Sequence, residues 1–222
     1  GHSQSPHKQI SPPLSHKDMK NKIICGDCLE VMRDIPDKSV DMILCDLPYG
    51  TTACKWDTII PFEPLWSQYK RIIKDNGAIV LTASQPFTSA LVMSNPDMFK
   101  YAWVWDKALP TGHLNANNRP MKRHEDILIF SNGKCPYNPT MRMGKMRARG
   151  GGNASPVYGK CTPKRSFSDQ YYPTSIIEIH NADQSKKSHP TQKPVALFEY
   201  LIKTYTNEND LVLDNCMGSG TT

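Results

Sequence analysis

The most constraining feature of this chain is an apolar run, residues 40–45, that ends abruptly in an acid. The run is followed by Asp46, Leu47, Pro48 and Tyr49, and then by a glycine. A short apolar run bounded by turn residues is typical of a strand buried on both faces of a parallel sheet. Open α/β sheets bind ligands at the carboxyl ends of their strands, so this strand would present a carboxylate at a binding edge. A strand that merely ends in a proline turn is the simpler alternative.

Other strand and helix patterns alternate along the chain, which favours an α/β fold. Strands are expected over residues 22–25, 40–45, 78–82, 101–105, 124–130, 176–179 and 210–214. Helices are expected from Asp27 to Met32, from Phe62 to a stop at Asn76-Gly77, after Pro86, and from Pro194 to Tyr205. Residues 107–122 are rich in glycine, asparagine and proline, which predicts a loop.

The composition suits a globular protein with one substantial core. Of 222 residues, 38% are hydrophobic, and no apolar run approaches the roughly 20 residues that span a bilayer. No export signal is visible, so we expect a cytoplasmic protein with reduced thiols. Cys25 and Cys28 have the spacing of zinc ligands, but no second close pair exists, and we predict no metal site. The net charge of +6 favours an anionic partner.

A basic segment interrupts the pattern of strands and helices. Residues 140–168 contain no acid and include a triple glycine at 150–152. The basic residues of this segment are Arg142, Lys145, Arg147, Arg149, Lys160, Lys164 and Arg165. Acid-free basic loops suit contact with phosphate groups, whereas a solvated loop is the simpler alternative.

Three motifs resemble those of amino-group DNA methyltransferases. Residues 46–49 resemble the Asp-Pro-Pro-Tyr signature of that family, and residues 212–222 resemble its S-adenosylmethionine loop. Residues 188–194 resemble the segment that precedes this loop in the β group. The catalytic motif comes first and the cofactor loop last, which is the circularly permuted order of the β group. The resemblance implies a Rossmann-like methyltransferase fold, with a mixed, mostly parallel sheet and helices on both faces.

The resemblance also implies an activity, which is methyl transfer from S-adenosylmethionine to adenine N6 of a flipped base in double-stranded DNA. The residues expected to be catalytic are Asp46, Leu47, Pro48 and Tyr49. The residues expected to bind the cofactor are Asp27, Asp46, His189, Lys193, Asp214, Cys216, Gly218 and Gly220. Cytosine N4 methylation is an alternative because both amines need the same acceptors, and an inactive DNA-binding protein is an alternative of another class.

Individual residues carry alternatives of their own. Asp27 fits either a contact to the adenine ring of the cofactor or an ordinary helix cap. Leu47 stands where the family has proline, and Cys216 stands where phenylalanine is common. A backbone carbonyl at Leu47 can still accept a hydrogen bond from the target amine.

The chain divides into four expected parts. Residues 1–20 are expected to form an N-terminal arm, 21–138 the catalytic part, 139–172 a basic target-recognition insertion, and 173–222 the cofactor-binding part. The sequence stops at Thr222, before the helix and strand that usually follow the glycine loop, so we expect a truncated cofactor part. The resemblance is compatible with a cognate restriction endonuclease and with a homodimer.

Overall fold

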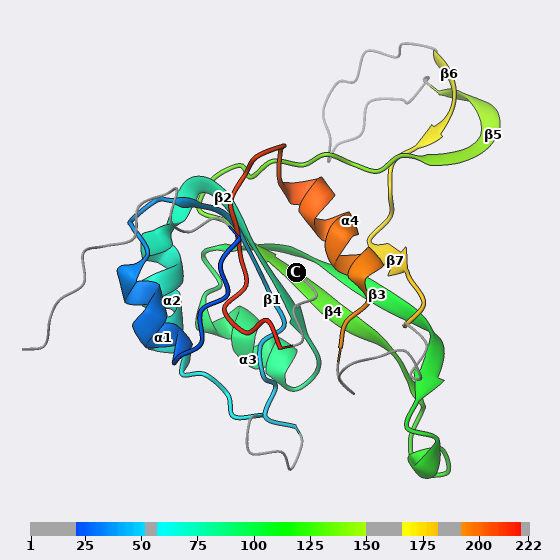
Figure 1. Ribbon diagram of the computed structural model, residues 1–222. Helices are drawn as coiled ribbons and strands as arrows, with labels where there is room; N and C mark the ends of the chain where they lie inside the picture. Colours follow the sequence, from blue (N-terminus) through cyan, green and yellow to red (C-terminus); the bar gives the residue numbers. More distant parts are fainter. Residues whose placement is uncertain (1–20, 52–56, 150–165, 182–191, 219–222) are drawn as a thin grey trace, which may run out of the picture.

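A six-stranded sheet lies at the centre of the structure, with helices on both of its faces (Figure 1). The structure is a computed structural model, which describes residues 21–51, 57–149, 166–181 and 192–218. The strand order is β7-β3-β4-β2-β1-β8. Strand β4 is antiparallel to both of its neighbours, whereas the remaining pairings are parallel. This confirms the mixed, mostly parallel α/β sheet expected from the sequence.

The bounds of the elements follow the predicted order closely. The strands of the sheet are β1 (Val40–Cys45), β2 (Ile73–Ala83), β3 (Phe99–Thr111), β4 (Lys122–Phe130), β7 (Ile176–Glu178) and β8 (Val212–Leu213). The helices are α1 (Cys28–Val31), α2 (Phe62–Ile72), α3 (Phe87–Ser94) and α4 (Val195–Tyr205), with 3-10 turns η1 (Met32–Asp34) and η2 (His113–Asn115). Strands β5 (Arg142–Arg149) and β6 (Ser166–Tyr171) pair separately as a two-stranded ribbon.

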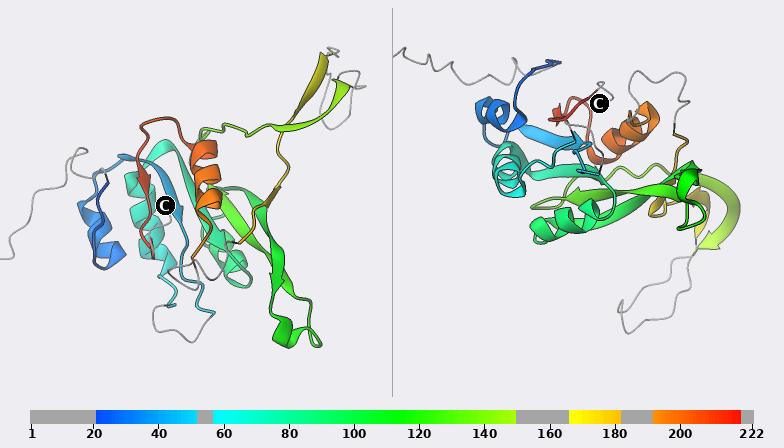
Figure 2. Two further views of the ribbon diagram at one scale, coloured as in Figure 1. Left: turned by 45° about the vertical axis from the view of Figure 1, so that its right-hand side comes forward. Right: turned by 90° about the horizontal axis from the view of Figure 1, so that it is seen from below.

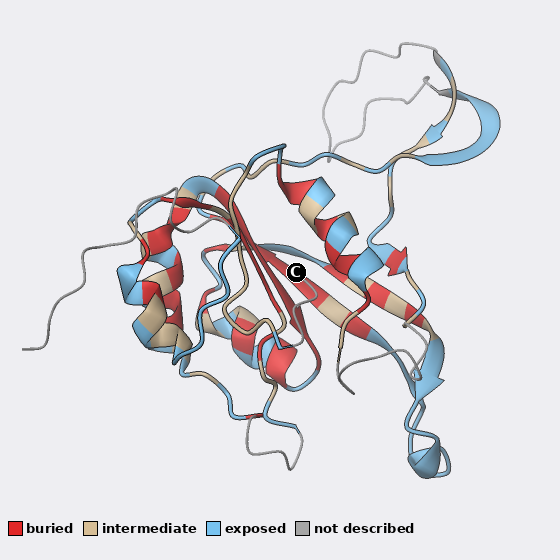
Figure 3. Cartoon of the chain, in the orientation of Figure 1, coloured by how far each residue is buried: buried red, intermediate tan, exposed pale blue. Residues whose placement is uncertain are grey.

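Strand β1 is buried on both faces, as its apolar run predicts. Ile43 and Cys45 pack into the core beneath α2 and α3, whereas Met42 and Leu44 pack into the core beneath α4. All four side chains are fully buried, and Figure 3 shows the central strands as the most buried part of the sheet. Successive residues of a strand point to opposite faces, so one strand contributes to both cores.

The pairing register brings the ends of several strands to one edge of the sheet, here called the carboxyl edge. Strand β1 is parallel to β2 and to β8, with Leu44 opposite Val80 and Met42 opposite Val212. Strand β4 runs the other way, so its first residues reach the same edge, where Glu125 lies opposite Trp105 of β3. Residues that are far apart in the sequence therefore meet beside the end of β1.

The predicted strand at residues 22–25 is wrong. The segment is extended but forms no ladder, and Ile23 is 78% exposed. Within the described part of the chain, the sheet ends at β8, which is only two residues long and pairs with β1. A strand needs hydrogen bonds from a neighbouring strand, and no described neighbour offers residues 22–25 a free edge of useful length.

Two further sequence predictions need correction. Helix α2 ends at Ile72, and the Asn76-Gly77 pair lies inside β2 instead of stopping a helix. A Cβ atom at Gly77 would lie 2.8 Å from the carbonyl oxygen of Asp41, so the glycine permits close approach of two strands. The predicted strand at 210–214 shortens to β8.

The predicted loop at 107–122 is confirmed for residues 112–121, but its first five residues continue β3 and Lys122 begins β4. Strand β3 continues to Thr111 and β4 begins at Lys122, so only residues 112–121 connect them. Residues 107–124, here called the hairpin arm, contain no acid and extend beyond the sheet at its carboxyl edge (Figure 2). The β5–β6 ribbon projects in another direction (Figure 1). No helix of the described residues is long and apolar enough to cross a membrane.

The packing of α4 against the sheet leads to a stability prediction. The hydroxyl group of Tyr205 in α4 accepts a hydrogen bond of 2.6 Å from the Trp103 indole and lies 2.9 Å from the Tyr101 hydroxyl. Tyr205→Phe leaves the buried indole N–H without its acceptor, so we expect a loss of about 1–3 kcal/mol in the free energy of unfolding. Urea denaturation checks this, with Tyr172→Phe on the exposed surface as the control. Equal stability of both variants would contradict the assigned role.

Candidate active site

The carboxylate of Asp46 lies at the carboxyl edge, directly after β1. Its Oδ1 atom accepts a hydrogen bond of 2.5 Å from the Thr82 hydroxyl at the end of β2. The Tyr49 hydroxyl lies 3.1 Å from the same oxygen. The Asp46 side chain remains 25% exposed, which is enough for contact with a substrate.

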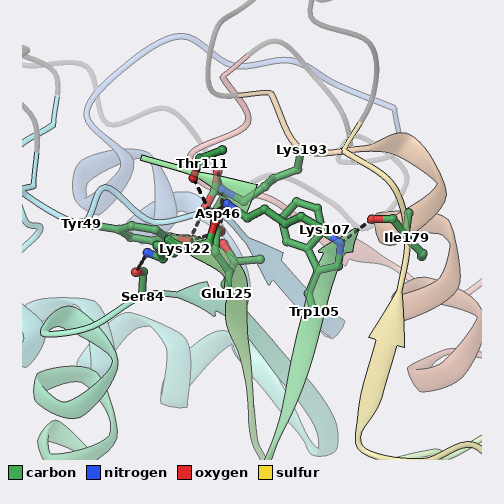
Figure 4. Close-up of polar contacts among 11 residues, drawn as sticks. Asp46, Tyr49, Ser84, Trp105, Lys107, Thr111, Lys122, Glu125, Ile179 and Lys193 are labelled. Atoms are coloured by element: carbon green, nitrogen blue, oxygen red, sulfur yellow. Dashed lines mark hydrogen bonds and ion pairs between the residues drawn. The ribbon is translucent and has the colours of Figure 1, made fainter. Parts of the chain in front are cut away.

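Two lysines and a second carboxylate complete the cluster around Asp46 (Figure 4). The Lys193 ammonium lies 2.9 Å from Oδ2 of Asp46 and 3.3 Å from Oε2 of Glu125. The Lys107 ammonium lies 2.5 Å from Oε1 of Glu125. Both lysine side chains and Glu125 are at most 11% exposed. Two negative and two positive groups therefore share one small, mostly buried volume, here called the charge cluster.

The electrostatics of the charge cluster favour the ionised forms. Burial disfavours the Glu125 carboxylate, but the Lys193 and Lys107 ammonium groups outweigh it and hold the pKa of Glu125 below its usual range. Burial also disfavours the Lys193 ammonium, yet Asp46 and Glu125 raise the pKa of Lys193 above that of a free lysine. Burial, reinforced by the two carboxylates, raises the pKa of Tyr49, so its hydroxyl stays protonated and can donate.

The Tyr49 ring is held between several groups. It stacks on Phe87 of α3, with ring centroids 5.3 Å apart and an angle of 25° between the planes. The Lys193 ammonium lies over the Tyr49 ring, 5.4 Å from its centroid. Asp57 fixes the following turn, because its carboxylate accepts hydrogen bonds from the backbone N–H groups of Gly50 and Thr51 at 2.8 and 2.9 Å. Phe87 therefore supports one face of the Tyr49 ring.

Three of the residues predicted to hold a cofactor, Asp214, Cys216 and Gly218, follow β8, one strand away from β1. Asp214 follows β8, and its carboxylate accepts a hydrogen bond of 2.9 Å from the backbone N–H of Cys216. Gly218 has a φ of +52°, a left-handed conformation that favours glycine, and among the described residues the nearest atom to a Cβ there would be the Cys216 carbonyl oxygen, at 4.0 Å. An acid and an open, tightly turned backbone fit the amino-acid end of S-adenosylmethionine.

Asp27 caps helix α1 in this structure. Its Oδ1 atom accepts hydrogen bonds from the backbone N–H groups of Leu29 and Glu30 at 2.9 and 3.2 Å. The helix-cap interpretation is thus correct, and contact with a cofactor stays a prediction for the other carboxylate oxygen. In the turn after β8, the side-chain amide of Asn215 donates a hydrogen bond of 3.5 Å to the Cys216 sulfur. Among the described residues no group of metal-ligand side chains could hold an ion.

The remaining predicted residues fall into three groups. Leu47 is only 4% exposed and packs in the core, so only its backbone can contact a substrate. Arg142, Lys145 and Arg147 are exposed on β5, and Arg149 is the last residue of that strand. His189, Gly220, Lys160, Lys164 and Arg165 lie outside the described residues.

Sequence reasoning missed three residues of the site, namely Thr82, Lys107 and Glu125. Each belonged to a segment that was interpreted only as a strand or a connecting loop. Of the three, only Glu125 could have been found from the sequence. An acid at the start of an apolar strand is buried at a cost in free energy unless it is paired, and here it also lies at a ligand-binding edge. Lys193 was predicted to contact the cofactor, but in this structure its ammonium contacts Asp46 and Glu125.

Comparison with known proteins identifies the family. The model of the N6/N4 DNA methylase family matches residues 40–222, which is most of the chain. The chain belongs to this DNA methylase family. It is 27% identical over 216 residues to the type II methyltransferase M.HpaI of Haemophilus parainfluenzae, covering 91% of this chain but 65% of that protein. It is also 27% identical to the DNA adenine methyltransferase YhdJ of Escherichia coli (strain K12), covering 90% of this chain and 72% of YhdJ.

Solved structures of DNA methyltransferases share the fold. The M1.HpyAVI–SAM complex is 26% identical, with a TM-score of 0.57, and the match covers 89% of this chain and 83% of that one. The cytosine-N4-specific PvuII DNA methyltransferase has a TM-score of 0.59 at 17% identity, covering 89% and 74% of the two chains. At that identity the second likeness shows the fold alone, so the methylase family is established without the identity of the methylated base.

The charge cluster leads to a prediction about the pH dependence of stability. The lowered pKa of Glu125 means that its ionised form stabilises the folded protein above about pH 4.5 and that this contribution is lost as the pH falls further. Lys107→Met removes one of the two cations that face Glu125. We therefore expect the free energy of unfolding at pH 7 to fall by about 3 kcal/mol. The loss should shrink below pH 5, because a protonated Glu125 needs no cation.

Urea denaturation of the parent and the variant at several pH values measures this difference. Lys203→Met is the matched control, because Lys203 forms an exposed ion pair with Glu199 on α4. We expect the control to change stability little at any of these pH values. A destabilisation by Lys107→Met that is the same at pH 4 and pH 7 would mean that Lys107 acts through packing alone.

Proposed function

We propose that this chain is the catalytic part of a DNA methyltransferase that methylates adenine N6, with S-adenosylmethionine as the methyl donor. The observation that carries the proposal is the Asp46 carboxylate, which is partly exposed at the carboxyl edge beside Tyr49. The turn after β8 lies one strand away at the same edge. A substrate amine and a methyl donor can therefore be held side by side.

The difficulty of the reaction explains the need for Asp46. The lone pair of an exocyclic amine is delocalised into the base, so the nitrogen is a poor nucleophile. Acceptors for its two N–H groups, the Asp46 carboxylate and the Leu47 backbone carbonyl, would favour sp³ geometry and localise the lone pair. When bound, S-adenosylmethionine supplies an electrophilic methyl group. The amine lone pair forms the new C–N bond, the C–S electron pair stays with sulfur, and the amine loses one proton to water.

Tyr49 supports the target base in this proposal. An enzyme that modifies a base inside a duplex must take it out of the stack and hold it by stacking. The Tyr49 ring is braced by Phe87, so it can receive a base without moving. Holding the amine in line with the methyl donor then accounts for much of the rate enhancement, because the chain contributes chiefly by positioning.

Asp214, Cys216 and Gly218 would hold the amino-acid end of the methyl donor, and Asp27 its adenine ring. The choice of adenine over cytosine rests on the aspartate at position 46. In the amino-group DNA methyltransferases that this chain resembles, serine is more usual at that position in the cytosine-N4 enzymes. The motif order supports the permuted β group. The type II names of relatives such as M1.MboII of Moraxella bovis favour a restriction endonuclease as a functional partner.

The β5–β6 ribbon supports the assignment of DNA as substrate. Arg142, Lys145 and Arg147 are exposed, and together with Tyr171 they line a shallow pocket of about 390 Å³. The Tyr171 hydroxyl donates a hydrogen bond of 2.6 Å to the carbonyl of Lys145, at the irregularity of β5 between Met143 and Arg147. A projecting two-stranded ribbon with basic side chains has the width to enter the major groove.

The first functional prediction concerns Asp46. Asp46→Asn replaces a carboxylate oxygen by an NH₂ group that cannot accept, so we expect methyl transfer to fall by at least about 100-fold. The assay measures labelled methyl groups in unmethylated genomic DNA, and mass spectrometry of the nucleosides identifies the product. Asp37→Asn on the exposed surface is the control. Activity within tenfold of the parent would remove Asp46 from the reaction, and N4-methylcytosine as the product would overturn the adenine assignment.

The second functional prediction concerns the ribbon. Replacing Lys145 and Arg147 together by alanine should weaken DNA binding and reduce the slope of log affinity against log salt by about 1.8, or about 0.9 per lost phosphate contact. Lys70→Ala on the exposed face of α2 removes a charge far from the proposed DNA surface and should leave the slope unchanged. Fluorescence anisotropy across a salt series measures both. An unchanged slope in the double variant would assign the ribbon charges to solvent.

A further inference from the structure

The Lys193 ammonium lies where the target amine has to bind. Its nitrogen is 2.9 Å from Oδ2 of Asp46 and 5.4 Å from the centroid of the Tyr49 ring. A stacked base would contact the same two groups, the Asp46 carboxylate through its exocyclic amine and the Tyr49 ring through its own ring. The other carboxylate oxygen, Oδ1, already faces the hydroxyl groups of Thr82 and Tyr49. A further N–H donor must therefore approach Oδ2, beside the lysine.

Lysine and substrate compete for the same kind of interaction. An ammonium group is a stronger hydrogen-bond donor to a carboxylate than a neutral amine is, because charge-assisted hydrogen bonds are about twice as strong. The amine nitrogen also becomes positive during methyl transfer, so a cation that stayed on Oδ2 would oppose the reaction. The proposed chemistry consequently requires a place for Lys193 away from Asp46.

Glu125 provides that place within the existing structure. Its Oε2 atom is 3.3 Å from the Lys193 nitrogen, so the ammonium already lies between the two carboxylates. Its other oxygen is paired with Lys107, which fixes the Glu125 side chain from β3. A small shift of Lys193 from Asp46 to Glu125 keeps two positive and two negative groups in the charge cluster. No buried charge loses all its partners during the shift, so the cost in free energy is low.

We propose that Lys193 is a displaceable substitute for the target amine and that Glu125 is the positioning residue that receives it when the base binds. The inference rests on the proposed function. In the DNA-free protein Lys193 neutralises and orients Asp46. When the base stacks on Tyr49, its amine takes Oδ2, and Lys193 moves fully to Glu125. Glu125 does not touch the substrate in this proposal; it acts through Lys193, and it also accepts a hydrogen bond of 3.3 Å from the Tyr49 hydroxyl.

The test uses a pair of nucleosides that differ only in the amine. Deoxyadenosine carries the exocyclic amine, and deoxynebularine is the same nucleoside without it. NMR titration of the full chain measures its affinity for each nucleoside. The ratio of the two affinities reports recognition of the amine. The measurement needs neither a DNA recognition sequence nor methyl transfer. We expect the parent to prefer deoxyadenosine. Glu125→Gln leaves Lys193 no anionic alternative to Asp46, so the preference should fall by about 10-fold or more.

The double variant separates positioning from a structural role. Adding Lys193→Met to Glu125→Gln removes the competing cation, so we expect the preference for deoxyadenosine to return to within about threefold of the parent. If Glu125 and Lys193 had purely structural roles, the double variant would prefer deoxyadenosine less than Glu125→Gln does. Removing a second charged group would then damage the site further. If Glu125→Gln does not fold, Lys193→Met alone is measured, and it should prefer deoxyadenosine at least as strongly as the parent does.

Several results would overturn the proposal. These are no preference for the amine in the parent, an unchanged preference in Glu125→Gln, a further loss in the double variant, or a weaker preference in Lys193→Met alone. Methyl transfer to DNA is measured in parallel for all four proteins. A parent that recognises the amine but transfers no methyl group would contradict the proposed function and leave the role of Lys193 intact, so the two failures can be distinguished.

Discussion

The interaction on which the site depends is the mutual neutralisation of two carboxylates and two ammonium groups at the carboxyl edge. Glu125, Lys107 and Lys193 are nearly buried, and a buried charge without a partner is expensive. Each group therefore requires the others to remain in place. This requirement ties Asp46 after β1, Lys107 in β3 and Glu125 near the start of β4 to Lys193, two residues before α4. Segments distant in the sequence are thereby held around the Asp46 carboxylate.

The sheet topology supplies the geometry for this neutralisation. Parallel strands β1 and β2 end together and place Asp46 beside Thr82, whereas the antiparallel strand β4 begins at the same edge and brings Glu125. A wholly parallel sheet would have put the first residues of β4 at the opposite edge. The single reversed strand thus allows a strand start and several strand ends to share one candidate site.

Two parts of the chain project from the sheet, the hairpin arm at the carboxyl edge and the β5–β6 ribbon in another direction. The hairpin arm begins at Lys107 in β3 and ends just before Glu125 in β4, and it contains no acid. The β5–β6 ribbon carries exposed basic side chains on a separate small sheet. Neither part contributes a described residue to the two buried cores.

The sequence by itself determined the fold class, the burial of β1 and the position of Asp46, because an apolar run of that length has few other stable environments. Local signals also fixed most helices, and the three motifs indicated the methylase family. The sequence could not predict that residues 22–25 remain unpaired, because strand formation depends on a neighbouring edge. It also could not reveal Glu125 and Lys107 as partners of Lys193. Charge pairing across a sheet depends on which strands become neighbours, and only the tertiary structure decided that.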